Sequence, residues 1–155
     1  MPFQIHALPA EDFAPLFALD DDALTARRAQ RVTVAKTPGY PCRISLADAE
    51  VGETIILLNH CCHDADTPYR ATHAIFVRPG VATARPAPDE VPEALARRLL
   101  SLRAFDATGM MRTADVVDGG DLGPALDAML AAPEIAEVAI HHAKQGCYAA
   151  RATRV

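Results

Sequence analysis

The sequence predicts an α+β fold in one globular domain, residues 1–155, with about four helices packed on a largely antiparallel or mixed sheet of about seven strands. Segments with strand patterning occur mostly as neighbours along the chain and do not alternate strictly with helices, which argues against a parallel α/β sheet. Half of the 155 residues are hydrophobic, so the chain is long enough and apolar enough to bury a core.

The first half of the chain predicts four strands and two short helices. The first helix presents Phe13, Leu16 and Phe17 on one face, and Pro15 delays the start of its regular part. A continuous apolar run at 55–58 indicates a central strand covered on both faces. The expected elements are strands at 3–8, 31–36, 53–59 and 73–78, helices at 11–19 and 22–28, and a turn at 45–50.

The second half of the chain predicts two hairpins and two helices. Residues 79–92 are rich in proline and are expected to form an exposed connection. Pro92 suits the first turn of a helix, where its missing N–H costs little, and Asp121 can cap the next helix. Glycines at 109 and 146 mark the hairpin turns. The expected elements are helices at 92–100 and between 121 and 133, and strands at 102–106, 111–117, 137–144 and 147–154.

Composition limits the classes of function. The formal net charge of -5 argues against nonspecific nucleic-acid binding, which requires a basic surface. No apolar run approaches the length of a membrane span, and the first residues lack the pattern of a signal peptide. The four cysteines are therefore expected to be reduced thiols in the cytoplasm, with a Cys42–Cys147 disulfide as the alternative.

Two irregular segments combine tyrosine, cysteine and arginine. Residues 38–43 have the sequence Pro-Gly-Tyr-Pro-Cys-Arg, and residues 146–148 have the sequence Gly-Cys-Tyr with an arginine just beyond. Guanidinium groups bind carboxylates and phosphates through paired hydrogen bonds, and phenols add a donor. The predicted ligand-binding residues are Tyr40, Arg43, Tyr69, Arg70, Arg103 and Arg151. The alternative is that these arginines pair with acids such as Asp48, Asp66 and Asp106 and hold the loops together.

Two thiols and a histidine are candidates for catalysis. Cys42 lies beside an arginine after a proline turn, a setting in which the pKa of a thiol can fall. A nucleophilic thiol also needs a base. The candidate catalytic residues are Cys42, Cys147 and His142, with His63 and His141 as alternative bases. The competing interpretation places both thiols in the core, which is the commoner position of a free cysteine.

The run His60-Cys61-Cys62-His63 has the residue types of a metal site. In a strand, alternate side chains face opposite sides, so these four could not hold one ion, whereas in a turn two or three could. The spacing fits a zinc site poorly. A site formed by Cys62, His63 and His142 is kept as a hypothesis, but we predict no metal and no cofactor.

Several of these segments together resemble a bacterial family catalogued as a domain of unknown function, DUF1203. The resemblance spans nearly the whole chain and implies no particular reaction. An aromatic residue is common near position 60 in that family, and a tyrosine is frequent where this chain has Phe105. The segments that carry the resemblance are Pro38–Arg43, Ser45-Leu46, Asp48-Ala49, Gly52-Glu53, Pro68–Arg70, Ile75–Arg78, Leu102–Asp106, Gly109-Met110 and Gly146–Arg151.

The leading functional hypothesis is a cytoplasmic protein that binds a small anionic molecule in an arginine- and tyrosine-lined cleft, with thiol chemistry as an open addition. Under this hypothesis, replacing Arg43 or Arg70 with alanine is expected to abolish binding of the anionic molecule without unfolding the protein. The alternative is a structural or protein-interaction module without a small-molecule site, such as a homodimer joined through a sheet edge. Neither hypothesis involves nucleic acid or a membrane, and whether the protein is an enzyme stays open.

Overall fold

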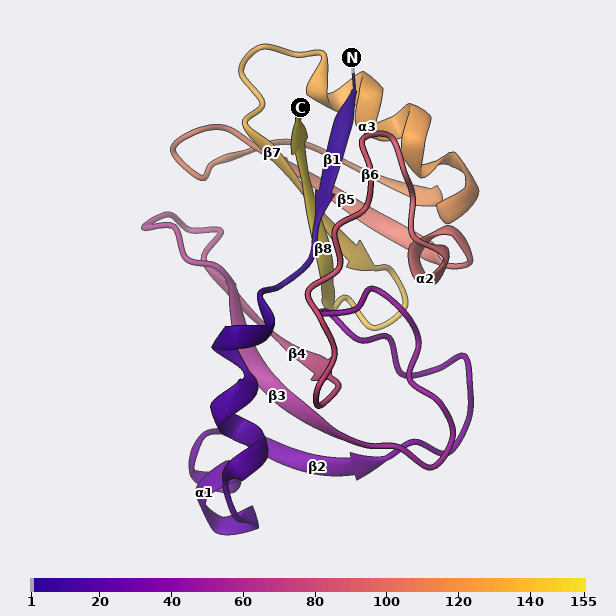
Figure 1. The fold of residues 1–155 in the computed structure, drawn as a ribbon. Coiled ribbons are helices and arrows are strands. Elements are labelled where there is room, and N and C mark those ends of the chain that lie inside the picture. The colour runs from indigo at the N-terminus through magenta and orange to yellow at the C-terminus, as the bar shows by residue number, and fades with distance from the viewer. Residues whose placement is uncertain (1) are drawn as a thin grey trace.

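The structure is a computed structural model that describes residues 2–155. These residues form eight strands in two antiparallel sheets (Figure 1). The strands are β1 (Phe3–His6), β2 (Ala29–Thr33), β3 (Thr54–His63), β4 (Ala71–Val77), β5 (Leu99–Phe105), β6 (Met111–Asp118), β7 (Glu137–His142) and β8 (Tyr148–Arg154). The larger sheet has the order β1-β8-β7-β5-β6, and the smaller sheet has the order β2-β3-β4.

Short helices and helical turns cover one side of each sheet. The described residues contain the α-helices α1 (Asp21–Ala26), α2 (Glu93–Ala96) and α3 (Leu122–Leu130), and the 3-10 turns η1 (Ala10–Asp12), η2 (Ala14–Ala18) and η3 (Gly119–Asp121). Figure 1 shows α3 lying across the larger sheet, and α1 with the first two 3-10 turns beside the smaller one. None of the helices in residues 2–155 has the length and apolar composition needed to cross a membrane.

Each sheet has its own hydrophobic core. In the larger sheet, Leu102 and Ile140 are fully buried beneath α3, which inserts Leu122, Leu126 and Leu130. In the smaller sheet, Ile56, Leu58, Ile75 and Val77 pack against Phe13 and Leu24 from the N-terminal helical turns. Because side chains alternate along a strand, only one face of the smaller sheet enters this second core.

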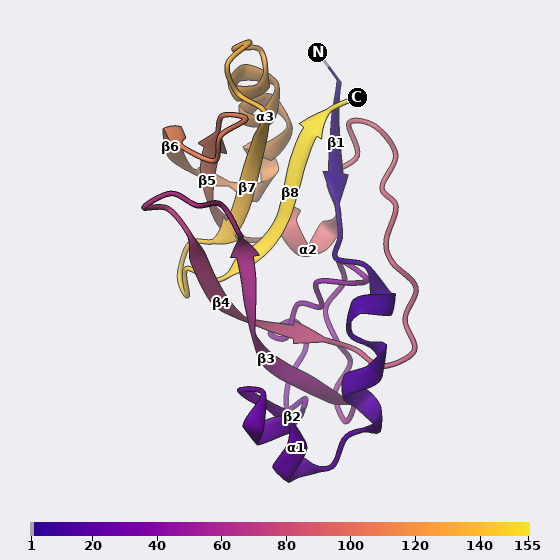
Figure 2. The ribbon, with the colours of Figure 1, turned by 90° about the vertical axis from the view of Figure 1, so that its left-hand side faces the viewer.

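The loop after β2 joins the two sheets. The backbone amide of Arg43 donates to the carbonyl of Phe76 in β4 (3.1 Å), and its carbonyl accepts from the amide of Leu8 (3.0 Å). The carbonyl of Ile44 accepts from the amide of Ala84 (2.8 Å). Strands β4 and β8 come into contact beside this loop, where the two sheets meet (Figure 2). The Pro-Gly-Tyr-Pro-Cys-Arg segment therefore lies at the junction of the fold.

The α+β class is confirmed, while the counts of elements were wrong. The described residues have eight strands, as many as the segments expected one by one but one more than the total of about seven, and three α-helices where about four were predicted. The predicted helix at 11–19 is two separate 3-10 turns, and Pro15, which has no N–H to donate, stands inside the second. The predicted helix at 92–100 has only one α-helical turn, because Leu99 and Leu100 pair with β6 and start β5. Asp121 occupies the N-cap position of α3, but its side chain makes no capping hydrogen bond.

The hairpins and the long connection agree with the sequence. Strands β5 and β6 pair across a turn in which Gly109 has a φ of 85°, and β7 and β8 pair across a turn in which Gly146 has a φ of 78°. Both values lie in the left-handed region that glycine adopts without a steric penalty. No helix or strand occurs between β4 and α2, where a proline-rich connection was predicted. Strand β3 is the central strand of its sheet and continues through His63, further than predicted.

Candidate functional site

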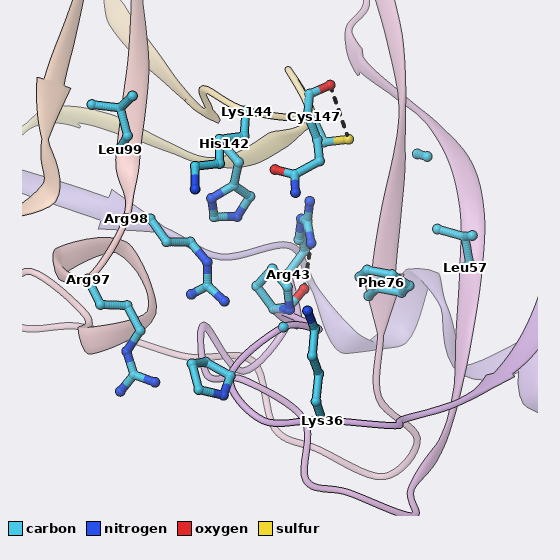
Figure 3. Close-up of a pocket in the computed structure, with 15 residues that line it drawn as sticks. Lys36, Arg43, Leu57, Phe76, Arg97, Arg98, Leu99, His142, Lys144 and Cys147 are labelled. Atoms are coloured by element: carbon cyan, nitrogen blue, oxygen red, sulfur yellow. Dashed lines mark hydrogen bonds between the residues drawn. The ribbon is translucent and has the colours of Figure 1, made fainter.

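A cavity of about 470 Å³ opens where the two sheets meet (Figure 3). Its wall is built from four parts of the chain. These are residues 36–43, residues 97–99 between α2 and the start of β5, the end of β7 with the turn that follows it, and one face of β3 and β4. The lining residues are Lys36, Pro38, Gly39, Pro41, Arg43, Leu57, Ala74, Phe76, Arg97, Arg98, Leu99, His142, Lys144, Gln145 and Cys147. We call this cavity the junction pocket.

The junction pocket is strongly basic. Five of its lining residues carry a positive charge, and none of the described lining residues is an aspartate or glutamate. The chain as a whole has a net charge of -5 and only two lysines, and both lysines line this pocket. The cationic residues are Lys36, Arg43, Arg97, Arg98 and Lys144.

Arg43 is the most deeply buried of these cations, with 3% of its surface exposed. Its Nε donates to the carbonyl of Tyr148 in β8 (2.7 Å), and its Nη1 donates to the carbonyl of Pro41 (2.5 Å). It forms no ion pair with a carboxylate among residues 2–155. Burial lowers the pKa of this guanidinium to about 10, since desolvation disfavours a charge that no acid compensates.

The local fold of the loop explains why Arg43 points inward. Residues 40–49 close on themselves: the amide of Ala49 donates to the carbonyl of Tyr40 (2.9 Å), and the amide of Cys42 donates to the carbonyl of Ala47 (3.0 Å). The bridge from Cys42 to Phe76 fixes this closed loop against β4. The next side chain along the chain is then directed between the sheets.

Arg97 and Arg98 follow α2 and share one acid. Asp48, whose side chain is almost buried, accepts from Nη1 and Nη2 of Arg98 and from Nη1 of Arg97 (3.4 Å). Arg97 also pairs with exposed Glu93 at 2.5 Å. Asp48 and Glu93 therefore offset part of the positive charge, and the five cations exceed these two carboxylates.

His142 and Cys147 add an imidazole and a thiol to the pocket wall. His142 is 5% exposed, and its Nδ1 is buried without a hydrogen-bond partner among residues 2–155. Burial, together with Arg43 and Arg98, lowers the pKa of His142 to about 3, so the ring is neutral at pH 7. Cys147 is half-buried, and its sulfur lies 3.9 Å from the carbonyl of Gln145.

A second, much smaller cavity of about 70 Å³ is lined by residues from both sheets. Its lining includes predicted site residues Tyr69 and Arg103, and also Cys62, His63 and His141. The rings of His63 and Phe105 are stacked at 3.9 Å, and those of His73 and His141 lie 4.9 Å apart. Burial lowers the pKa of His141 to about 4, and burial raises the pKa of Cys62 to about 11.

The other predicted ligand-binding residues lie outside both cavities. Arg70 is exposed and pairs with Asp64, and Arg151 is exposed and pairs with Glu137 at 3.5 Å. Tyr40 packs against Phe76, with ring centroids 5.2 Å apart. The four predicted arginines thus do not converge on one pocket.

The remaining predictions concern the thiols and the metal site. Cys42 is 2% exposed in the core of the smaller sheet, where its sulfur accepts from the amides of Ser45 and Arg78 (both 3.4 Å). All four cysteines are free, Cys42 and Cys147 included. Cys62 and His63 line the small cavity while His142 lines the junction pocket, and residues 2–155 contain no group of three or more ligands placed to hold a metal.

Four of the five cations in the junction pocket were not identified from the sequence. Arg97 and Arg98 lie far along the chain from the Pro-Gly-Tyr-Pro-Cys-Arg loop, and a helix end with two arginines is typical of a solvated surface. Lys36 lies just before that loop, and Lys144 lies just before the Gly-Cys-Tyr turn. The presence of the chain's two lysines beside its two unusual motifs is the signal that could have marked the pocket.

Comparison with known proteins identifies a family for this chain, but that family has no described activity. No curated protein and no solved structure is significantly similar to the chain. The family model described as "Protein of unknown function (DUF1203)" matches residues 39–154, a range that begins within the Pro-Gly-Tyr-Pro-Cys-Arg loop and ends at the last residue of β8. The chain belongs to this family, DUF1203.

Proposed function

We propose that this protein binds a small anionic molecule, a phosphate or carboxylate compound, in the junction pocket. The observation that carries the proposal is the buried Arg43 guanidinium, which has no acidic partner among residues 2–155 and opens onto a cavity lined by four more cations. A buried charge without compensation is costly, and a bound anion would supply the missing negative charge.

The size and placement of the pocket favour a small ligand. Its volume of about 470 Å³ falls in the range of small-molecule sites. A nucleic acid is contacted by a broad basic surface, whereas here the cations surround one cavity in a chain of net charge -5. Guanidinium groups from the α2 end and ammonium groups from the flanking loops could bind separate oxygens of one anion.

The two lysines provide the cleanest test. Arg43 holds two backbone carbonyls, so its removal would disturb the fold together with the pocket. Lys36 and Lys144 are exposed and form no hydrogen bond or ion pair with other residues in 2–155. The double variant K36A/K144A therefore removes two charges from the pocket at little structural cost.

We expect inorganic phosphate to bind the wild-type protein at low ionic strength, and the affinity of K36A/K144A to be lower by about tenfold or more. Isothermal titration calorimetry with inorganic phosphate measures both. The matched control is R27A/R85A, which removes the same charge from two exposed arginines outside the pocket and should bind phosphate like the wild type. The absence of phosphate binding to the wild type, or equal losses in both double variants, would contradict the proposal.

A further inference from the structure

The face of the smaller sheet that looks into the junction pocket is apolar and incompletely covered. Leu57 on β3 is directly opposite Phe76 on β4, and Ala74, two residues before Phe76, lies on the same face of the sheet. All three line the junction pocket, and none of them belongs to the buried core on the opposite face, which contains Ile56 and Ile75. Leu57 and Phe76 are half-buried, and Ala74 is exposed.

Residues 2–155 cover only one end of this face. Val34, Ala49 and Ile55 form a small buried cluster there, and Tyr40 and part of Phe76 pack against it. Beyond this cluster the apolar surface continues as the pocket wall formed by Leu57, Ala74 and the rest of Phe76. An apolar wall left open inside a pocket is a surface that a ligand can bury.

Three of the cations lie apart from the apolar wall of Leu57, Ala74 and Phe76, on a side of the pocket that also carries Leu99. Figure 3 shows Arg97, Arg98 and Lys144 on the side of the larger sheet, Phe76 and Leu57 on the side of the smaller sheet, and Arg43 between them. A ligand that spans the pocket therefore meets charge at one end and hydrocarbon at the other. The volume of about 470 Å³ is also much larger than a bare phosphate or carboxylate group requires.

We propose that the ligand of the junction pocket is an amphipathic anion, with a phosphate or carboxylate held by Arg43 and its neighbouring cations and an apolar, ring-sized body on the wall of Leu57, Ala74 and Phe76. This inference rests on the proposed anion-binding function and specifies its substrate class.

The test compares two probes that carry the same anionic group. We expect phenyl phosphate to bind at least about tenfold more tightly than inorganic phosphate, because burying a ring on the apolar wall adds hydrophobic free energy to the same charge contacts. The substitution Leu57→Asn should remove most of this preference and leave the affinity for inorganic phosphate unchanged. Val51→Asn, at an exposed apolar residue outside the pocket, is the matched control and should retain the preference.

The outcomes separate this inference from the proposed function. If inorganic phosphate binds and phenyl phosphate binds no more tightly, the pocket is an anion site and the amphipathic inference is wrong. If phenyl phosphate is preferred and both Leu57→Asn and Phe76→Ala retain the preference, the ring lies elsewhere and the inference is also wrong. Thermal unfolding of each variant verifies its fold, and if neither probe binds the wild type, the proposed function and this inference fail together.

Discussion

Arg43 shows how one residue can serve both the fold and a site. Its backbone joins β4 to the residues that follow β1, and its side chain reaches the carbonyl of Tyr148 in the larger sheet. Two of its nitrogens are thus held by neutral acceptors, and the charge itself has no acidic partner among the described residues. The expectation that alanine at this position abolishes binding without unfolding no longer follows, because the carbonyls of Tyr148 and Pro41 would lose their donor.

The two buried histidines of β7 make stability depend on pH. Burial lowers the pKa of His141 to about 4 and that of His142 to about 3, from an ordinary value of 6.5. Below pH 6.5 the unfolded chain binds protons that the folded chain does not, so the free energy of unfolding must fall as the pH falls towards 4. We expect a slope of up to about 1.4 kcal/mol per pH unit for each histidine, measured by urea unfolding between pH 7.5 and 4.5.

A single substitution isolates the contribution of His142. In His142→Gln, one of the two most strongly lowered histidine pKa values is removed, so the decline in stability on acidification should be less steep by up to about 1.4 kcal/mol per pH unit. An unchanged slope in this variant would show that His142 does not keep its neutral form at pH values below 6.5 in the folded protein.

The end of α2 is the element that places two of the pocket cations. Helix α2 has only four residues, and it is held by contact with η3: the amide of Gly119 donates to the carbonyl of Arg98 (2.8 Å). A Cβ added to Gly119 would lie 2.0 Å from the carbonyl oxygen of Leu95. This contact is with backbone, which cannot rotate away as a side chain could.

Gly119→Ala should therefore displace α2 together with Arg97 and Arg98. We expect a loss of about 1–3 kcal/mol in the free energy of unfolding, and weaker binding of inorganic phosphate, measured by urea unfolding and calorimetry. The neighbouring Gly120 provides the matched control, since a Cβ there meets no atom within 4 Å. Similar losses in Gly119→Ala and Gly120→Ala would mean that the α2 contact is not the cause.

Local elements were predicted well, and elements that depend on distant pairing were not. The hairpins β5–β6 and β7–β8 have turn glycines and flanking apolar residues, which are signals carried by adjacent residues. The division into two sheets depends on pairings such as β1 with β8, whose residues lie almost the whole chain apart. The same limit applies to the site: Arg43 was identified from its loop, whereas Arg98 and Lys144 join it only through the packing of the sheets.

At the scale of the whole molecule, the charges are separated in space. The protein is acidic overall, yet its two lysines and three of its arginines surround one cavity that also contains Cys147. A concave site of one sign concentrates small ions of the opposite sign, and added salt screens the effect. This arrangement can be tested with the thiol as the reporter.

The reporter is the rate of alkylation by anionic iodoacetate divided by the rate of alkylation by neutral iodoacetamide. This ratio should be higher at Cys147 than at Cys61, which is half-buried and lies outside both cavities. We expect the ratio to be several-fold higher at Cys147 than at Cys61. At Cys147 it should fall in K36A/K144A and in about 0.5 M salt, because the attraction of iodoacetate is electrostatic. Peptide mass spectrometry of each cysteine over time provides the rates. Equal ratios at Cys147 and Cys61 would argue against a focused positive potential in the pocket.

The pairing of β1 with β8 has a practical consequence for protein engineering. Phe3 is opposite Arg154 in the sheet, so residues 2 and 155 lie side by side, and the intervening strand β8 places them about 26 Å from Cys147. A short linker could join these two positions, and the chain could be reopened in the exposed turn between β3 and β4, which would give a circular permutant. In such a permutant β1 and β8 become a covalent hairpin, and the pocket loops keep their own connections.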